Sequence, residues 1–356
     1  MIKVAFFPYH PDLCILAKNI EKLMGYEICG FLSYKEDAKR IHALNASIGL
    51  STTSYEAVIN ECDIVILCDN YRGLLTDKYI RIIEYTLQHG KEIFALPVVE
   101  SQVDFSDYKG QYRILEHLPE NQGIEEAHSP VKHIRRINTP IIGIVGQGEC
   151  CGKFENQILV KTVLDENYET IAITSNPLGA LFGHYTTPSI LFEEMSFTQK
   201  IIKYNQYVRG VEESNNPDAI VLGIPGGIAP YNARSSNNFA EYPLVVSSAV
   251  PIDLGVLCVY YNASFSQDSA LKEMIHYCKG RFEIQLGAIS VSSTYCDFST
   301  VDDGVTFEHL SREFMHRYHR EYENIGIPVM SPLMGEEAKA AIRLCVRQLQ
   351  ENVRGV

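Results

Sequence analysis

The sequence lacks any run of about 18 apolar residues, which is the length that a membrane-spanning helix requires. The longest candidate, residues 242–263, is interrupted by Pro251 and Asp253 and is better interpreted as two strands. The opening stretch, MIKVAFFPYHPD, holds one lysine and too short an apolar segment for a secretory signal peptide. We therefore expect a cytoplasmic protein.

Basic residues are also few. Lys and Arg together number 31 against 44 Asp and Glu, which gives a formal net charge of −13 with histidine neutral. Nucleic acids and anionic membranes attract clustered Lys and Arg, so this balance argues against both as partners. The apolar fraction of 46% and the charged fraction of 21% are close to globular averages, which excludes disordered, collagen-like and coiled-coil chains.

The ten cysteines lack the spacing that metal or disulfide chemistry requires. No C-x-x-C pair occurs, and no group of Cys and His has zinc-site spacing. A disulfide framework is typical of small secreted domains, which a chain of 356 residues is not. Most of the cysteines lie in apolar stretches, such as those around Cys68 and Cys258, and we expect them to be free, buried thiols.

The sequence does contain a regular alternation of short apolar strands and helices. In the first hundred residues, strands are predicted at 2–7, 28–32, 63–67 and 92–96, and helices at 12–24 and 76–89. This alternation predicts a parallel sheet wound in right-handed βαβ units. The first domain, residues 1–100, is therefore expected to be Rossmann-like.

This first domain lacks the glycines of a dinucleotide site. NAD or FAD binding needs G-x-G-x-x-G at the first strand-to-helix turn, which here reads FPYHPD over residues 7–12. The turn has no glycine, and its two prolines lack N–H donors. An NAD-type dehydrogenase is therefore an unfavoured alternative that depends on fold analogy alone. Tyr9 and His10 either line a small-ligand crevice or close the strand as a polar turn.

Residues 101–138 lose the alternation and are expected to connect two domains. The segment ends in a basic cluster at 132–136, which we interpret as a solvated face. The alternation resumes in the second domain, residues 139–356. Strands are predicted there at 141–145, 170–174, 219–224, 256–260 and 286–291, and helices at 153–165, 198–213, 267–279, 307–322 and 336–352.

The sharpest motif is a glycine-rich loop between the strand at 141–145 and the helix at 153–165. Its residues are Gly146, Gln147, Gly148, Glu149, Cys150, Cys151, Gly152 and Lys153. The backbone N–H groups of such a loop and the positive end of the helix bind phosphate, and the lysine reaches the terminal phosphates. The motif predicts ATP or GTP as the ligand, and Lys153 is the candidate catalytic residue. The fold class that follows is α/β, with two parallel-sheet domains, Rossmann-like followed by P-loop NTPase-like.

The loop departs from the standard G-x-x-x-x-G-K-[ST] pattern in two ways. It is one residue longer, which resembles the dethiobiotin synthetase-like branch of P-loop proteins, and Phe154 replaces the Ser or Thr that coordinates Mg²⁺. The strand at 219–224 also carries Gly223 where a carboxylate would stand near the metal. These two losses together argue against an ordinary Mg²⁺ site. A second glycine-rich turn follows that strand and adds three candidate binding residues, Pro225, Gly226 and Gly227.

The strand at 170–174 leads into polar residues. Because ligands bind at the carboxyl ends of parallel strands, the candidate contacts of a second substrate are Ser175, Asn176, His184 and Tyr185. An ordinary polar loop explains these four residues equally well. The adjacent Cys150 and Cys151 would be reactive if the helix N-terminus lowered a thiol pKa, although a backbone role in the loop is favoured.

Four stretches together resemble the clostridial peptide maturation system protein family. They are Gly-Lys-Phe at 152–154, Ser-Asn-Pro at 175–177, Leu-Phe-Gly-His-Tyr-Thr-Thr-Pro-Ser at 181–189 and Ile-Pro-Gly-Gly-Ile at 224–228. The resemblance covers most of the chain and implies a role in natural product biosynthesis, in the maturation of a ribosomally made, Cys-rich peptide. The partners that it implies are the precursor peptide, a radical SAM maturase and an acyl-carrier-related protein. It supplies no reaction.

Two classes of function fit these observations. The absence of the usual metal ligands favours an accessory protein that binds a nucleotide or another phosphate compound. The alternative is an ATP- or GTP-dependent ligase or kinase-like enzyme that activates a carboxylate or carbamate. Phosphoryl transfer needs positioning and charge neutralisation, which the loop and Lys153 begin but do not complete without a metal ligand.

Overall fold

The computed structural model describes residues 1–50, 54–69, 76–119, 133–230, 240–262, 268–297, 305–317 and 325–354. The chain divides into two compact units. The first unit comprises residues 1–117 and 177–184, and the second comprises residues 118–176 and 185–356. The chain therefore leaves the second unit after Asn176, adds a short segment to the first, and returns at Tyr185.

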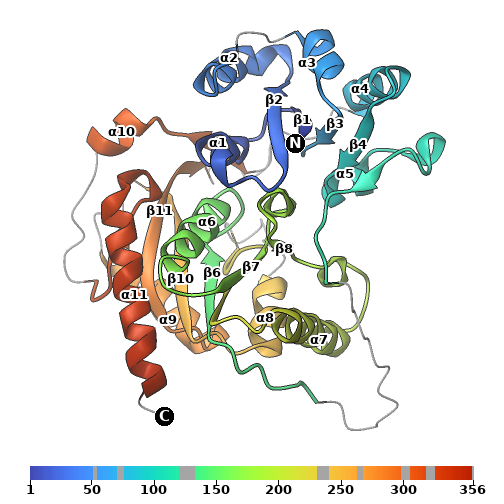
Figure 1. Ribbon diagram of the computed structural model, residues 1–356. Helices are drawn as coiled ribbons and strands as arrows, with labels where there is room; N and C mark the ends of the chain where they lie inside the picture. Colours follow the sequence, from blue (N-terminus) through green and yellow to red (C-terminus); the bar gives the residue numbers. More distant parts are fainter. Residues whose placement is uncertain are drawn as a thin grey trace. The chain divides into compact units, whose positions relative to one another are not determined.

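The first unit is a five-stranded parallel sheet with helices around it (Figure 1). Its strands are β1 (Ile2–Phe7), β2 (Tyr26–Phe31), β3 (Ile64–Leu67), β4 (Glu92–Ala95) and β5 (Arg113–Ile114). Its helices are α1 (Leu13–Lys18), α2 (Ala38–Ser47), α3 (Tyr55–Glu61), α4 (Thr76–Gln88) and α5 (Pro97–Gln102), with short 3-10 turns at Ile20–Lys22, Lys35–Asp37, Ser106–Tyr108 and Pro177–Phe182. The strand order is β2-β1-β3-β4-β5. The chain thus adds β2 on one side of β1 and the later strands on the other side, so the strand order reverses between β1 and β3.

The second unit is a larger sheet of the same kind. Its strands are β6 (Ile141–Gly146), β7 (Thr170–Thr174), β8 (Tyr185–Thr186), β9 (Ala219–Gly223), β10 (Leu254–Tyr261), β11 (Leu286–Asp297), β12 (Thr306–His309) and β13 (Val329–Met330). Its helices are α6 (Lys153–Leu164), α7 (Phe197–Asn215), α8 (Glu241–Ala249), α9 (Asp268–Phe282), α10 (Arg312–Arg317) and α11 (Glu336–Arg354), with 3-10 turns at Ser189–Leu191 and Pro332–Met334. The order is β12-β11-β10-β6-β9-β7-β8, with β13 beside β11, and of the described strand pairs only β11–β12 is antiparallel.

The predicted α/β fold class with two parallel-sheet domains is confirmed. The strands predicted at 2–7 and 170–174 have the predicted bounds, most others differ by one or two residues at an end, and the strand predicted at 286–291 continues to Asp297. These strands are apolar on both faces, as in β3 and β9, because helices cover both sides of a parallel sheet. Sequence reasoning missed α2, α3, α5, α8, β5, β8, β12 and β13.

Two predicted elements are wrong. The helix predicted at 307–322 begins instead as β12, because the long β11 extends to Asp297 and pairs with residues 306–309 along its last four residues. A short helix, α10, follows, and residues 318–324 lie outside the described residues. The first part of 242–263, interpreted as a strand, is α8: Pro243 lies in the first turn, where proline is tolerated, and Pro251 follows the end of the helix.

Three aspartates set the register at the amino ends of the sheets. Asp63, Asp218 and Asp253 each immediately precede a strand, namely β3, β9 and β10. Each carboxylate accepts a hydrogen bond from a backbone N–H at the start of the neighbouring strand, and the donors are Lys3, Glu169 and Ile141, all at 2.8 Å. These bonds satisfy backbone donors that have no partner within the ladder.

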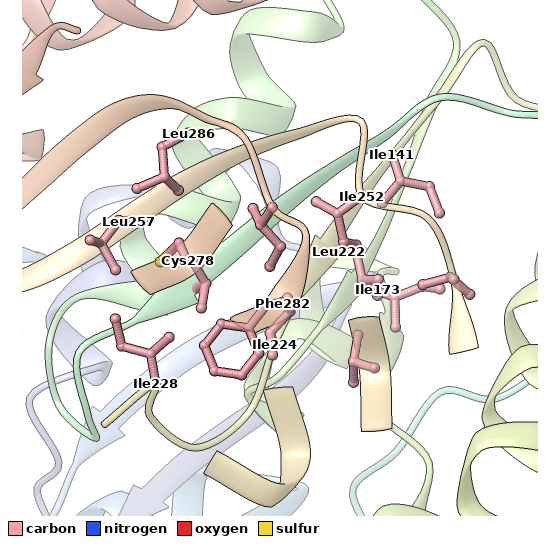
Figure 2. Packing of buried hydrophobic residues seen from close by; sticks show 14 of the residues in the cluster. Ile141, Ile173, Leu222, Ile224, Ile228, Ile252, Leu257, Cys278, Phe282 and Leu286 are labelled. Carbon is pink, nitrogen blue, oxygen red and sulfur yellow. The ribbon is translucent and has the colours of Figure 1, made fainter. Parts of the chain in front are cut away.

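The second sheet has an apolar core on each face. The helices α7, α8 and α9 pack on one face, and Figure 2 shows part of this cluster, with Leu222, Ile224 and Ile228 near Phe282 and Cys278. The opposite face is covered by α6 and α11, which bury residues such as Val160 and Ile342. The carboxyl ends of β6 and β9 therefore emerge between two packed layers, which hold the loops that follow them.

The remaining expectations concern cysteines, charge and hydropathy. All ten cysteines are free thiols, and eight of them are buried, as expected. In the basic cluster, residues 133–136 are exposed, and Lys132 lies outside the described residues. No helix in the described part of the chain is long and apolar enough to cross a membrane.

Glu212 of α7 anchors the chain where it enters the second sheet. One carboxylate oxygen accepts hydrogen bonds from the N–H groups of Asn138 and Thr139, both at 2.7 Å, and the other accepts one from Arg209 at 2.6 Å. Burial raises the pKa of Glu212, but these donors outweigh it and leave the pKa below its ordinary value. A carboxyl group with a lowered pKa stabilises the folded state at pH values above its unfolded-state pKa. This contribution is lost as the pH falls through the folded-state pKa.

We expect Glu212→Gln to lower the free energy of unfolding by about 2 kcal/mol at neutral pH, because charge-assisted hydrogen bonds are lost. The difference from wild type should shrink as pH falls below about 4, where the wild-type carboxylate also becomes protonated. Thermal unfolding at several pH values measures this. The control is Glu194→Gln, which makes the same change in charge at an exposed position away from Arg209. A stability difference that does not vary with pH would contradict the assignment.

Candidate functional site

The glycine-rich loop lies between the end of β6 and the start of α6, and β10 holds it in place. The N–H of Gln147 donates to Cys258 O at 2.8 Å, and Gln147 Oε1 accepts from Tyr260 N at 3.2 Å. The hydroxyl of Tyr260 donates to Glu149 O. The loop is thus bonded to the neighbouring strand β10 at two of its residues, Gln147 and Glu149.

The backbone of the loop turns sharply before α6 begins. Cys150 and Gly152 have positive φ angles of 54° and 82°, and Gly152 is left-handed at the N-cap of the helix. Left-handed residues beside right-handed ones are typical of loops that bind anions through backbone N–H groups, and the helix N-terminus carries a partial positive charge. Gly146 is required by packing, since a Cβ there would lie 2.5 Å from Cys151 Sγ.

Lys153 links the two glycine-rich turns. Its side chain is only 7% exposed, and its Nζ donates to Gly148 O at 3.1 Å and to Gly226 O. The carboxylate of Glu149 lies 3.5 Å from the same Nζ. Ile228 N also donates to Gly146 O at 2.9 Å. The structure therefore brings together the candidate residues of the first loop, 146–153, and those of the second turn, 225–227.

The two positions where a metal ligand is missing are both packed. Phe154 is 3% exposed. Gly223 leaves space for the carboxamide of Gln157, and a Cβ at Gly223 would lie 2.5 Å from that group. Gln157 is fully buried, donates to Ser175 Oγ at 2.9 Å, and accepts from Ser175 N at 3.1 Å. A neutral amide thus occupies the place beside β9 where the sequence pattern would put a carboxylate near Mg²⁺.

Within the part of the chain that the structure describes, no group of three or more His, Cys, Asp or Glu is arranged to hold a metal ion. Burial raises the pKa of Cys151, whose thiol donates to Gly148 O at 3.1 Å, which argues against the reactive-thiol alternative for this residue and agrees with the favoured backbone role. Cys150 is half-buried and contributes its left-handed backbone.

The four candidate substrate contacts are divided between the two units, with Ser175, Asn176 and Tyr185 in the second unit and His184 in the first. Ser175 is engaged by Gln157, and Asn176 O accepts from Thr174 Oγ1 at 3.0 Å. The hydroxyl of Tyr185 accepts a hydrogen bond from Asn215 Nδ2 at 3.0 Å. His184 belongs to the first unit, where its ring stacks on Phe182 and its carbonyl oxygen accepts from His117 Nδ1 at 3.2 Å.

In the first unit, polar side chains gather where β1 and β3 end. His10 is 8% exposed, its Nδ1 accepts from Asp12 N at 3.2 Å, and its Nε2 lies 3.8 Å from Asp69 Oδ2. Tyr9 N donates to Ser33 Oγ, after β2, at 3.3 Å. This is the reversal point of the sheet, where doubly wound folds bind ligands. The hydrogen bonds of His10 and Tyr9 hold the turn in place, and they assign no chemical role to either residue.

Sequence reasoning missed three residues of the loop region: Gln157, Tyr260 and Tyr242. The ring of Tyr242, at the start of α8, lies over Gly226. Gln157 comes one turn of helix after Lys153, and a buried polar residue so close to a phosphate loop is the signal that could have indicated it. Tyr242 had no such signal, because its segment was interpreted as a strand.

No family model matches the sequence, and no curated protein matches it. Among solved structures, a DUF1611 family protein from Anabaena variabilis aligns with 96% of this chain and 99% of its own, with a TM-score of 0.57 and 11% identity. This likeness supports the overall fold. A GTPase in apo form from Pyrococcus abyssi covers 58% of this chain and 84% of its own at TM-score 0.29 and 13% identity. A LAO/AO transport system kinase covers 62% and 69% at TM-score 0.28 and 12% identity.

We expect Gly223→Ala to lower the free energy of unfolding by about 1–3 kcal/mol, because the new methyl group meets a buried carboxamide that two hydrogen bonds hold in place. In Gly223→Ala/Gln157→Ala the clash is absent, so the double variant should be more stable than the sum of the single effects predicts. Urea unfolding of the four proteins measures this coupling. Strictly additive effects would show that Gln157 does not occupy the space beside Gly223.

Proposed function

We propose that this protein binds the phosphate groups of a nucleotide in the loop of residues 146–153. The observation that carries the proposal is the buried ammonium of Lys153, which joins two glycine-rich turns at the start of α6. A buried cation requires a counter-charge, and here the nearest carboxylate is that of Glu149, whose side chain is 56% exposed. A phosphate group can replace this exposed carboxylate and accept hydrogen bonds from the loop as well.

The residues present fit a phosphate better than they fit Mg²⁺. The loop offers backbone donors, a helix N-terminus and a lysine, which are the groups that bind phosphate without a metal. Phe154 and Gly223 provide no oxygen ligand, and Gln157 fills the space between β9 and α6. We therefore favour a binding protein over a ligase or kinase-like enzyme, and assign no phosphoryl-transfer step to these residues.

The biological setting that we propose is the maturation of a ribosomally made peptide. It is supported by the sequence resemblance alone, and its partners would be the precursor peptide, a radical SAM maturase and an acyl-carrier-related protein. In this setting the nucleotide would act as a signal or an organising ligand. Titration of each purified partner into the protein, with and without the nucleotide, tests this part of the proposal.

Calorimetric titration of ATP, GTP and inorganic tripolyphosphate, with and without Mg²⁺, tests phosphate binding directly. Wild type should bind without needing Mg²⁺, and Lys153→Ala should bind at least tenfold more weakly, since a charge-assisted contact is worth about 1.5–3 kcal/mol. The matched control is Lys161→Ala, on the same helix but paired with Asp165 at 2.8 Å. Equal affinities of wild type and Lys153→Ala would refute the site.

Replacing Glu149 tests whether its carboxylate competes with the ligand for Lys153. We expect Glu149→Gln to bind tripolyphosphate about 1.5- to fivefold more tightly, because an ion pair with one exposed partner, at 3.5 Å, is worth about 0.2–1 kcal/mol. The control is Glu213→Gln, which makes the same change in net charge on α7. The proposal predicts a tightening only at position 149, so a similar effect of both variants would indicate overall charge instead.

A further inference from the structure

Two cysteines that are far apart in the sequence lie together in the first unit. Cys29 belongs to β2, at the edge of the sheet, and Cys62 immediately follows α3. Val58 of α3 joins them, because its carbonyl oxygen accepts from Cys62 N at 3.1 Å and lies 4.0 Å from Cys29 Sγ. The helix approaches β2 this closely because Gly30 has no side chain: a Cβ there would lie 2.7 Å from Val58 Cγ1.

The thiols of these two residues face each other. Cys29 Sγ donates to Val4 O at 3.2 Å. Cys62 Sγ donates to Ile59 O at 3.3 Å, and the side chains of Cys29 and Cys62 are also hydrogen-bonded to each other. Cys29 is 7% exposed and Cys62 is fully buried. Two thiols in direct contact can form a disulfide without a large movement of the backbone.

A lysine gives Cys62 a chemical environment that Cys278, another buried cysteine, lacks. Lys91 Nζ donates to Cys62 O at 2.7 Å and to Asn60 O at 3.0 Å, so its ammonium lies at the end of α3 beside Cys62. The hydrogen bond from Cys29 lowers the pKa of Cys62, burial raises it, and Lys91 lowers it again, which leaves it below the ordinary value. Burial instead raises the pKa of Cys278 to about 12. Because the thiolate is the nucleophilic form of cysteine, Cys62 is the more reactive of these two residues.

We propose that Cys29 and Cys62 form a site of oxidative modification, at which a peroxide converts the two thiols into a disulfide. The thiolate of Cys62 attacks one oxygen of hydrogen peroxide and breaks the O–O bond, which gives a sulfenic acid and a hydroxide that is protonated to water. The thiol of Cys29 then loses its proton and attacks this sulfur, and the displaced hydroxide leaves with that proton as a second water. Two thiols are oxidised and one peroxide is reduced.

The burial of the pair selects the oxidant. Hydrogen peroxide is little larger than water, whereas glutathione disulfide is too large to reach a sulfur that is fully buried. The disulfide would join β2 to the end of α3 and close a loop that carries α2 and α3, which constrains the unfolded chain. This inference is independent of the proposed phosphate site.

Peptide mapping of the full chain tests the pair. The folded protein is treated with hydrogen peroxide, its remaining thiols are blocked with N-ethylmaleimide in denaturant, and it is digested without reductant. The peptides that carry Cys29 and Cys62 should be linked, with the loss of two thiols, and dithiothreitol should restore both. The control is Cys278, which should stay reduced. The proposal is overturned if no such link forms, if it forms only in protein unfolded before the treatment, or if Cys278 is oxidised as fast.

Single substitutions test the order of the two steps. In Cys29→Ser the second thiol is missing, so the sulfenic acid of Cys62 should persist and be trapped by dimedone. In Cys62→Ser the attacking thiolate is missing, so Cys29 should remain a thiol at the same peroxide concentration. Cys278→Ser is the matched control and should form the disulfide as wild type does. Equal dimedone labelling of the first two variants, or labelling of neither, would refute the assignment of Cys62 as the attacking sulfur.

Discussion

One buried ammonium group determines how the site is built. Lys153 is almost fully removed from water, so its donors must be satisfied by protein, and carbonyl oxygens of both glycine-rich turns satisfy them. The turns meet because β6 and β9 are neighbouring parallel strands whose carboxyl ends lie at the same edge of the sheet. Glycine is needed where these turns approach the lysine and Tyr242, since a Cβ at Gly146 or Gly226 has no room.

The rule that a buried polar group needs a hydrogen-bond partner also explains the arrangement around the uncharged Gln157. Gly223 creates space at the end of β9, Gln157 of α6 fills it, and Ser175 after β7 satisfies both ends of the amide. Three elements are joined by one carboxamide, and no charge has to be desolvated. An aspartate at this position would face a buried amide and would need a cation to balance it. This arrangement agrees with the proposal that Lys153 provides the charge for a bound phosphate.

The sequence determined the fold more fully than the site. Strands such as β6 and β9 could be predicted because both of their faces are buried, so the apolar run itself marks them. Periodicity could not distinguish α8 from a strand, since a short apolar run bounded by prolines suits both. It also could not indicate β12, which exists because β11 is long enough to offer it a partner. Gln157 was missed because its role depends on Gly223, far away in sequence, and no local pattern records that pairing.

The departures from the standard loop form a coherent set. Phe154 is buried, Gln157 is fully buried with its hydrogen bonds made, and the absence of a Cβ at Gly223 leaves room for the Gln157 carboxamide. Each of these three positions is therefore closely packed, as protein interiors generally are. The proposal of a phosphate site depends on the groups beside them, namely the buried lysine and the glycine-rich loop at the start of α6.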